Sequence, residues 1–396
     1  MTRSTDIAIV GAGPAGIGAA LAAARNGARV VIIDENSALG GHLRWTMARQ
    51  SGFGDELDGL RGHEIASWAT GLLANTGVEV LTSAVAWGLF DDNALGVLTA
   101  DSSFQLHADR VIIATGSTDL TWPFPGWELP GIVTATCALR LLHLDRVLPG
   151  RRVAVVGAGS LAEQVVADLH ACGGIAVARL PAVSDVTVGG SDRVEWIDDG
   201  GQRTVCDTVV LALGRQPDAQ LALQAQVALT YSVDDGVFVA ARDEALATSV
   251  AGVYVVGDAG GVNTPARAFA EGAVAGEAAT GGTALASALE RLRTIGRQTE
   301  PYPPLPAIAD DTMVCRCEEV RANVLRAAIR DGAISLNDLK RRTRAGMGVC
   351  QGIYCNRAMA GMIASEAGVP IGSVVSMTAR PPARLIPMAA MADLEP

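Results

Sequence analysis

Four of the seven cysteines in this 396-residue chain lie close together near its C-terminus. They form two pairs, Cys315-x-Cys317 and Cys350-x-x-x-x-Cys355. Thiolates from two short loops can hold either a zinc ion or an iron–sulfur cluster. Only the cluster would exchange electrons, so the two alternatives imply different functions. Free thiols are the third alternative. The other cysteines (137, 172 and 206) are solitary and are expected to be small core residues.

A second set of residues, at the start of the chain, suits the binding of a nucleotide. Gly11, Gly13 and Gly16 give the spacing G-x-G-x-x-G. Gly11 allows a tight turn, Gly13 lets a pyrophosphate approach the backbone, and Gly16 lets a helix pack closely on a strand. The helix expected from Pro14 to about Asn26 would direct its N–H groups and its positive dipole end at the phosphates.

The flanking elements must position these glycines. Residues 7–10 and 30–33 are apolar and predict two buried parallel strands, one starting at Asp6 and the other at Arg29. Asp34 follows the second strand, about 20 residues after the glycines, where a carboxylate can accept a hydrogen bond from a ribose hydroxyl. Strand, turn, helix, strand and acid in this order predict a dinucleotide site. The alternative is a tight turn that only packs.

The same pattern returns later in the chain. Residues 152–162 repeat the strand, the glycine turn and the helix start, with Gly157 and Gly159 in the turn. Residues 209–215 repeat the apolar strand and small-residue turn of residues 111–116. The chain therefore contains two dinucleotide-type units, an internal repeat at the scale of a domain.

Composition and charge exclude several classes of function. The net charge of −11 argues against a nucleic-acid surface. Residues 7–24 are apolar, but glycine and alanine dominate them and Pro14 interrupts them, so we expect neither a signal peptide nor a membrane span. An odd cysteine count without a signal sequence does not suggest a disulfide framework. We expect a soluble, cytoplasmic protein, with peripheral attachment to the inner membrane through its electron acceptor left open.

These motifs resemble those of the two-dinucleotide flavoproteins that include the pyridine nucleotide–disulfide reductases. The resemblance rests on the glycine turn with Asp34, on Ala114-Thr115-Gly116, on residues 157–162 and on Gly257-Asp258. It implies that the first unit binds FAD and that Asp258 contacts the ribityl chain. The cofactor-binding residues that it implies are Gly11, Gly13, Pro14, Ala15, Gly16, Asp34, Glu35, Gly40, Gly41, His42, Val85, Thr115, Gly116, Gly257 and Asp258.

Two departures from that family change the expected chemistry. No cysteine precedes Cys137, so a dithiol beside the flavin is not expected. The strand after the second glycine turn ends in Arg179-Leu180, with no acid to read a ribose. We expect this second unit to be degenerate, and binding of a second nucleotide at Gly157–Ala162 stays open. No residue is assigned as a catalytic acid or base, since a histidine such as His42 in a glycine loop is more often packed or solvated.

The cysteine module resembles bacterioferritin-associated-ferredoxin-like modules, which bind a 2Fe-2S cluster. Its second pair has the wider spacing of members fused to FAD dehydrogenases. The resemblance implies that Cys315, Cys317, Cys350 and Cys355 ligate the cluster. Residues 313–345 carry more basic than acidic side chains. They could steer a partner, stabilise the anionic cluster, or form a solvated face.

The whole order of motifs, ending in Arg380-Pro381-Pro382, resembles the A-type subunits of opine oxidase, hydrogen cyanide synthase and proline or hydroxyproline dehydrogenases. The resemblance implies an electron-transferring subunit with FAD and a 2Fe-2S cluster. Its partner would be an amino-acid-oxidase-like FAD subunit that oxidises an amino acid, imino acid or opine. Further expected partners are an electron acceptor of quinone, dye or ferredoxin type and a small ferredoxin-like subunit.

Two other functions remain open at this stage. One is a stand-alone NAD(P)H-dependent reductase that passes electrons through FAD and the cluster to a ferredoxin-type partner. The other is a scaffold that carries cofactors without using them. The fold class expected is α/β, with two Rossmann-like domains and a small helical module. The expected parts are 1–120 with 241–285 for FAD, 121–240 for the second unit, 286–312 as a Pro-rich linker, 313–370 as the module, and 371–396 as a tail on the body.

Overall fold

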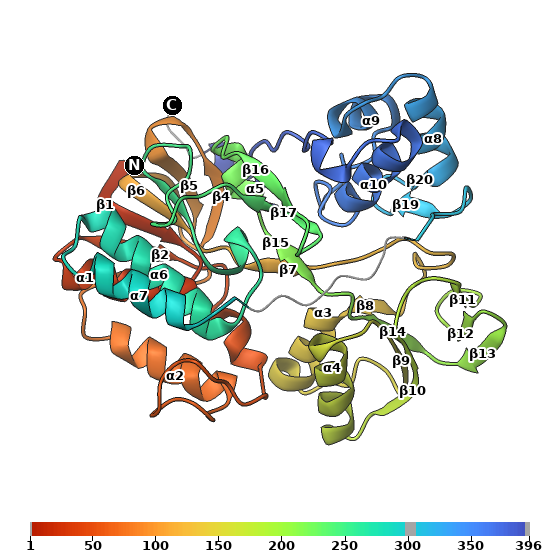
Figure 1. The fold of residues 1–396 in the computed structure, drawn as a ribbon, viewed down its shortest axis with the longest axis horizontal. Helices are drawn as coiled ribbons and strands as arrows, with labels where there is room; N and C mark the ends of the chain where they lie inside the picture. The colour runs from red at the N-terminus through yellow and green to blue at the C-terminus, as the bar shows by residue number, and fades with distance from the viewer. Residues whose placement is uncertain (1, 298–305, 393–396) are drawn as a thin grey trace.

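The computed structural model describes residues 2–297 and 306–392, which form the three parts visible in Figure 1. A large sheet with its helices lies at the left, a smaller sheet at the lower right, and a helical module at the upper right. Three prolines of the expected linker, Pro301, Pro303 and Pro304, lie outside the described residues. The α/β fold class with a helical C-terminal module is confirmed.

The large sheet has seven strands in the order β3-β2-β1-β6-β5-β4, with β18 also paired to β6. Its central strand β1 is apolar on both sides, so Ile7 and Ile9 enter one core while Ala8 and Val10 enter the other. A parallel strand covered on both faces needs this pattern. The strands are β1 (Thr2–Val10), β2 (Val30–Ile33), β3 (Glu79–Leu81), β4 (Val85–Leu89), β5 (Ala94–Leu98), β6 (Ser103–Ile113) and β18 (Val253–Val255).

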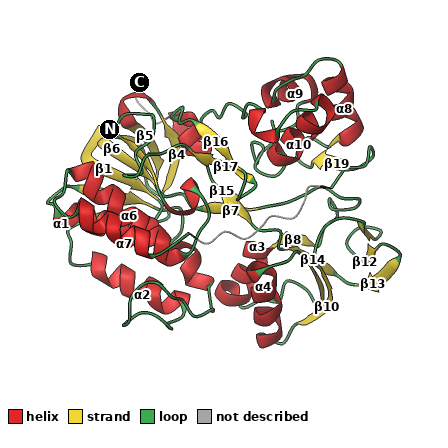
Figure 2. Cartoon of the chain, in the orientation of Figure 1, coloured by secondary structure: helices red, strands yellow, loops and turns green. Residues whose placement is uncertain are grey.

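One face of this sheet is covered by helices, which Figure 2 shows in red. The long helices α1 and α6 are in backbone contact, because a Cβ at Gly272 of α6 would lie 1.9 Å from the Ala15 carbonyl oxygen of α1. Glycine is therefore required at that position. The helices are α1 (Pro14–Arg25), α2 (Gly62–Leu73), α6 (Pro265–Thr280) and α7 (Leu285–Thr294), with short 3-10 turns η1 (Gly41–Trp45), η2 (Asp91–Asn93) and η4 (Gly257–Gly260).

Helix α7 occupies the start of the stretch that the sequence assigns to a linker. Leu285, Leu289 and Leu292 pack against the core beneath α1 and α6, and Leu292 is buried. Their spacing of four and three residues is helical. The prolines further along the chain, which are typical of a linker, obscured this pattern in the sequence. The first part of the stretch expected as a linker is therefore helical up to Thr294, and the bounds of the linker stay a prediction.

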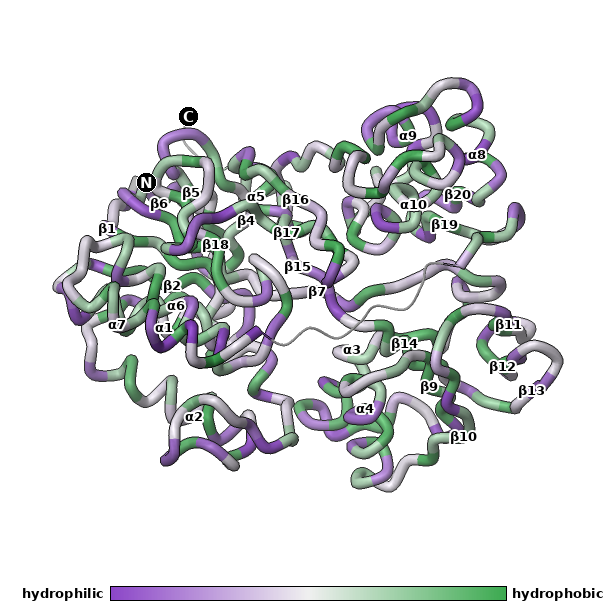
Figure 3. The backbone as a smooth tube through the Cα atoms, in the orientation of Figure 1, coloured by the Kyte–Doolittle hydropathy of each residue, from purple (hydrophilic) through white to green (hydrophobic). Residues whose placement is uncertain are grey.

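The smaller sheet is parallel, in the order β10-β9-β14-β8, and a three-stranded antiparallel ribbon lies beside it. Figure 3 colours β14 of this sheet and β18 of the large sheet as hydrophobic. The elements are β8 (Ile132–Thr134), α3 (Ala135–Arg140), η3 (Leu141–Asp145), β9 (Arg152–Val156), α4 (Ser160–Ala171), β10 (Ile175–Leu180), β11 (Val186–Gly189), β12 (Trp196–Asp199), β13 (Gln202–Val205) and β14 (Thr208–Leu211).

Two crossing strands join the sheets. β7 (Ser117–Asp119) leads out of the large sheet and pairs antiparallel with β15 (Arg215–Pro217), which leads back. After β15, side chains up to Ala240 pack on the outer face of the large sheet. The domain boundaries stay predictions, and this packing favours a return to the first domain near residue 218. The returning elements are α5 (Gln220–Gln224), β16 (Leu229–Ser232) and β17 (Val237–Ala240).

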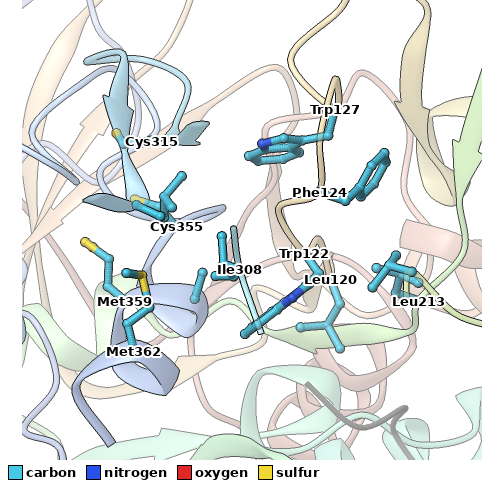
Figure 4. Close-up of a cluster of buried hydrophobic side chains, with 14 of the residues drawn as sticks. Leu120, Trp122, Phe124, Trp127, Leu213, Ile308, Cys315, Cys355, Met359 and Met362 are labelled. Atoms are coloured by element: carbon cyan, nitrogen blue, oxygen red, sulfur yellow. The ribbon is translucent and has the colours of Figure 1, made fainter. Parts of the chain in front are cut away.

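The C-terminal module shares one hydrophobic core with the smaller sheet. Figure 4 shows this junction, with Cys315 and Cys355 on one side of Ile308 and with Trp127 and Phe124 on the other. The module and the smaller sheet are therefore packed as one body. The module comprises β19 (Met313–Cys315), β20 (Val320–Arg321), α8 (Ala322–Arg330), α9 (Leu336–Thr343) and α10 (Asn356–Ala367), followed by η5 (Ile371–Ser373) and α11 (Met388–Ala392).

The tail after the module runs back to the large sheet. Val374 and Met377 are buried in the module's core, and the side chain of Asn337 exchanges two hydrogen bonds with Thr378. Further on, the Ala383 N–H donates to the carbonyl oxygen of Trp87 in β4 at 2.6 Å. The tail thus connects the module to the first domain. Within the part of the chain that is described, no helix combines the length and apolarity needed to cross a membrane.

The contact between α1 and α6 predicts an asymmetry between two glycine-to-alanine changes. Gly272→Ala places a methyl group against backbone, so we expect it to lower the free energy of unfolding by about 1–3 kcal/mol. Gly71→Ala, inside α2, meets nothing within 4 Å and should be neutral or stabilising by about 0.5–1 kcal/mol. Urea unfolding of both variants checks this. Equal stabilities would show that the two helices can separate at no cost.

Candidate functional site: a nucleotide cavity and a cysteine module

The glycine turn after β1 is fixed by backbone contacts. Gly11 has φ +104°, and a Cβ there would lie 2.2 Å from the Ala114 carbonyl oxygen. Gly16 is equally constrained, since its Cβ would lie 1.8 Å from the Gly11 carbonyl oxygen. Helix α1 then begins at Pro14 with Gly13 as its N-cap, and no side chain caps its free N–H groups. These N–H groups are available to an anion.

Asp34 is buried and bonded to this turn. Its Oδ2 accepts from the Ala12 N–H at 2.6 Å, while its Oδ1 accepts from the backbone and side-chain nitrogens of Asn36 at 2.8 and 2.9 Å. A carboxylate offers about four acceptor positions, so one remains for a ligand. Contact with a ribose stays a prediction, while the bond to Ala12 gives Asp34 a structural role in the turn.

The turn opens on a cavity of about 640 Å³. Three of the expected cofactor residues do not line the cavity: Gly16, Gly40 and Gly257. They pack in the turns behind its wall, where a Cβ on Gly257 would lie 2.7 Å from the Ala15 methyl. The expected cofactor residues that line the cavity are Gly11, Gly13, Pro14, Ala15, Asp34, Glu35, Gly41, His42, Val85, Thr115, Gly116 and Asp258.

Asp258 is held on the cavity wall by three donors. Its Oδ2 accepts from Ser117 Oγ at 2.9 Å and from an Arg215 Nη1 at 3.3 Å, and its Oδ1 accepts from the Asn263 N–H at 3.2 Å. Below it, Glu271 accepts from the N–H of Gly257 at 3.0 Å. The Asp258 carboxylate is therefore oriented from several elements at once.

His42 faces the same network. Its Nδ1 lies 2.8 Å from Arg215 Nη1, and its ring lies 5.0 Å from that of Trp45. Burial, and next the Arg215 guanidinium, lower the pKa of His42 to about 4. Neutral imidazole then accepts from Arg215 through Nδ1 and keeps an Nε2–H donor. His42 is therefore hydrogen-bonded to Arg215, whereas the sequence led us to expect a histidine that is only packed or solvated.

Helix α6 directs a second N-terminus at the cavity. Thr264 caps it by accepting from the Arg267 N–H at 3.2 Å, and Pro265 lines the cavity. The buried Glu271 of α6 is neutralised by Arg242 at 2.8 Å and Arg267 at 3.3 Å. Two helix dipoles therefore favour negative charge in one cavity, as a diphosphate-bearing cofactor or a reduced flavin requires.

Sequence reasoning missed several residues of the cavity wall: Ser117, Arg215, Asp218, Tyr354 and Arg384. Arg215 directly follows a strand-ending glycine, so its place at a strand's carboxyl end was a usable signal. Ser117 directly follows Gly116 and carries the same signal, whereas three-dimensional contacts alone bring Asp218, Tyr354 and Arg384 to this wall.

The four module cysteines lie as two pairs. Cys317 Sγ and Cys350 Sγ are 3.6 Å apart, and Cys355 is hydrogen-bonded to Cys315. A tetrahedral zinc site needs four donors at one point, whereas the two irons of a 2Fe-2S cluster share four thiolates between them. The pairing fits the cluster.

The inner pair of thiols is buried and polarised. The hydrogen bond from Cys355 lowers the pKa of the Cys315 thiol to about 6, and N–H groups including that of Gly346, 3.5 Å from Cys315 Sγ, act in the same direction. That bond and burial raise the pKa of Cys355. The outer pair differs, since Cys317 is exposed and Cys350 half-buried. A cluster held here would have one edge toward the core and one toward the surface.

Four of the eight basic side chains in residues 313–345, those of Arg326, Arg330, Arg342 and Arg344, have acidic partners. Arg344 pairs with Glu318 at 2.8 Å, and Arg342 pairs with Asp331 at 2.7 Å. Arg316 lies over the ring of Trp127, 5.3 Å from its centroid. These contacts favour the solvated-face alternative for the basic excess.

Residues 5–174 and 160–272 match the family model described as pyridine nucleotide-disulphide oxidoreductase. The chain belongs to this family. Residues 313–365 match the model of the BFD-like 2Fe-2S binding domain. Because the cavity and the thiol pairs fit the groups that these two families bind, the cofactors of this oxidoreductase are FAD and a 2Fe-2S cluster. A second nucleotide at Gly157–Ala162 stays a prediction.

Relatives cover almost the whole oxidoreductase. It is 31% identical to the A-type subunit of opine oxidase from Rhizobium meliloti (strain 1021), over 98% of each chain. It is 26% identical to hydrogen cyanide synthase subunit HcnB of Pseudomonas protegens, over 89% of this chain and 90% of the relative. The crystal structure of L-proline dehydrogenase from P. horikoshii superposes with a TM-score of 0.87 and 29% identity, over 98% of this chain and 80% of that one. The resemblance drawn from the sequence is confirmed.

The thiol pairing predicts which cysteines the iron requires. Cys350→Ser or Cys355→Ser should remove most of the iron, about two atoms per chain in the parent, together with its visible absorption. Cys172→Ser is the matched control and should keep both, because Cys172 lies outside the module and, like Cys137, is exposed and not the core residue expected from the sequence. Iron and acid-labile sulfide analysis checks this. Zinc in place of iron, in protein purified without added metal, would contradict the cluster.

The lowered pKa of His42 predicts a pH dependence of stability. Between pH 6.5 and about 4 the unfolded chain binds a proton that the folded chain excludes, so stability falls as pH falls through this range. We expect the FAD-free parent to lose about 1–2 kcal/mol more than His42→Asn between pH 7.5 and 5. Urea unfolding at both pH values checks this, with His170→Asn, on the exposed surface of α4, as the control. Parallel losses in all three proteins would contradict it.

Proposed function

We propose that this chain is the electron-transferring subunit of a heteromeric dehydrogenase or oxidase acting on CH–NH or CH–NH2 donors. In this proposal a partner flavoprotein of the amino-acid-oxidase type oxidises the amino acid, imino acid or opine. When both groups are bound, FAD supplies two-electron chemistry and the 2Fe-2S cluster supplies single-electron steps. The chain's residues hold the two sites close together and direct one toward the surface.

The observation that carries the proposal is the position of the cysteine loop against the flavin cavity. Tyr354, between the predicted ligands Cys350 and Cys355, is itself part of the cavity wall. Burial, with Asp119 nearby, raises the pKa of its phenol. An aromatic side chain therefore lies in the wall between the two predicted cofactor sites.

Side-chain hydrogen bonds from β15 and from the residues just after β7 hold this loop. Gln216 Nε2 in β15 donates to the Ile353 carbonyl oxygen at 3.0 Å, and Thr121 Oγ1 donates to the Tyr354 carbonyl oxygen at 3.3 Å. β15 also carries Arg215, which contacts His42 and Asp258. The same two-stranded ribbon thus positions both the flavin-side network and the cysteine loop.

The hydrogen bonding of the polar groups near the cavity supports electron transfer by this chain in preference to oxidation of an amine substrate. His42 is neutral with its Nδ1 engaged by Arg215, and Asp258 is bonded to Ser117, Arg215 and Asn263. Groups bonded in this way orient a cofactor, and no proton transfer to a substrate amine is required of them. The chain's similarity to proteins named as subunits of opine oxidase and of hydrogen cyanide synthase supports a partner that performs the amine oxidation.

The exposed edge of the module supports an outlet for electrons. Cys317 is exposed, and the neighbouring Val349 side chain is largely exposed as well. We propose that the acceptor, of quinone, dye or ferredoxin type, or a small ferredoxin-like subunit, approaches at this edge. The cytoplasmic location expected from the sequence stays a prediction.

Anaerobic reduction separates this proposal from an NAD(P)H-dependent reductase. We expect NADH and NADPH to leave the flavin absorption near roughly 450 nm unchanged, because no acid follows β10 to read a ribose. An amino or imino acid should bleach the flavin band only when the co-expressed partner flavoprotein is present. Omission of the partner is the control.

Rapid bleaching by either nicotinamide cofactor, without the partner, would replace the proposal with the reductase. The cysteine variants distinguish the remaining alternative, a scaffold. If Cys350→Ser leaves the assembled complex fully able to reduce an external acceptor, the cluster carries no electrons and the chain only assembles the complex.

A further inference from the structure

The C-terminal tail contacts the cofactor cavity of the first domain. Ala383 donates its N–H to the Trp87 carbonyl oxygen at 2.6 Å and packs on the large sheet's outer core. Ala383 and Arg384 both belong to the cavity wall. Residues separated from the glycine turn by nearly the whole chain therefore take part in enclosing the same space.

Arg384 lies between two carboxylates at the edge of the cavity. Its Nε donates to Glu35 Oε2 at 3.1 Å, and its Nη2 donates to Asp218 Oδ2. Glu35 follows β2, Asp218 follows β15, and Arg384 comes from the tail. We call these three residues the cavity rim.

The charges of the rim make Arg384 important for an anionic ligand. Asp218 has only 4% of its side chain exposed, so its charge is poorly screened by water. Without Arg384, two carboxylates would face a cofactor whose diphosphate is negative, and they would repel it. A guanidinium has five N–H donors, and Arg384 uses one on its own neighbour's carbonyl oxygen and two on the rim. Two donors remain for a ligand.

The other end of the tail is fixed to the cysteine module. Met377 is buried there, and a Cβ on Gly346 would lie 2.6 Å from its Cε. Gly346 in turn donates its N–H to Cys315 Sγ at 3.5 Å. The tail therefore contacts the cluster site at Met377 and, a few residues later, the flavin cavity at Ala383.

We propose that the tail is part of the FAD site, with Arg384 positioning the cofactor, and that FAD binding and tail docking strengthen one another. Thermodynamic linkage requires this reciprocity, because a ligand that binds better with the tail docked must favour the docked tail. The inference rests on FAD in the cavity and is independent of the donor that reduces it.

Removing the guanidinium tests the first half. Arg384→Ala should weaken FAD binding to FAD-stripped full-length protein by about tenfold or more, the loss expected for a hydrogen bond to a charged group. Arg380→Ala removes the same charge from an exposed position in the same tail and should change the affinity less than about twofold. Isothermal titration with FAD measures both, and equal affinities would overturn the proposal.

A double variant separates charge balance from misfolding. Adding Asp218→Asn to Arg384→Ala removes one of the two uncompensated carboxylates, so affinity should recover part of the loss. A disrupted fold would not recover, and absence of recovery would overturn the role of Arg384 in charge balance.

Limited trypsin digestion tests the second half. The bond after Arg384 leads into Leu385, which is 75% exposed, while Arg384 itself is held in the rim. FAD should slow cleavage at this bond in the parent protein, measured by mass spectrometry of the released C-terminal peptide. Equal cleavage rates with and without FAD would overturn the coupling between cofactor and tail.

Discussion

The close contact between α1 and α6 is the constraint on which the first domain depends. Three glycines, Gly18, Gly272 and Gly276, let the backbones touch where any larger residue would hold them apart. Because the helices are this close, their N-termini open on a single cavity, and the turn carrying Asp258 lies beside the turn carrying Gly13. Two dipoles then act on one ligand, which neither helix could arrange alone.

The second domain supports the cysteine module through its hydrophobic core. The crossing strands lead to Trp122 and Trp127, whose indole N–H groups donate to the Pro306 and Met313 carbonyl oxygens. Their rings belong to the core that also contains Cys315 and Cys355. The smaller sheet therefore gives the cysteine module a fixed base, whether or not a nucleotide binds at its own glycine turn. A complete core is compatible with the degenerate site expected from the sequence, because packing needs the apolar residues whereas reading a ribose would need an acid after β10.

The sequence predicts the features that depend on local spacing. The glycine turns, the buried strands and the two cysteine pairs are each visible within about 30 residues, and the fold class follows from their order. What could not be predicted depends on contacts between distant segments. Arg215 reaches His42, Arg384 reaches Glu35, and Tyr354 reaches the cavity only because the crossing strands and the tail bring them there. Helix α7 was missed for a different reason, since the prolines after it outweighed a weak helical pattern.

The cavity rim joins residues that are far apart in the sequence, and this has a consequence for folding during synthesis. Glu35 and Arg384 are 349 residues apart, and a ribosome adding about 5–20 residues per second takes roughly 20–70 s to travel between them. The strand β18 and helix α6, which complete the sheet and the helix pair, also emerge late. Until residue 384 is synthesised, the chain therefore carries an intact glycine turn but lacks the arginine of its cavity rim.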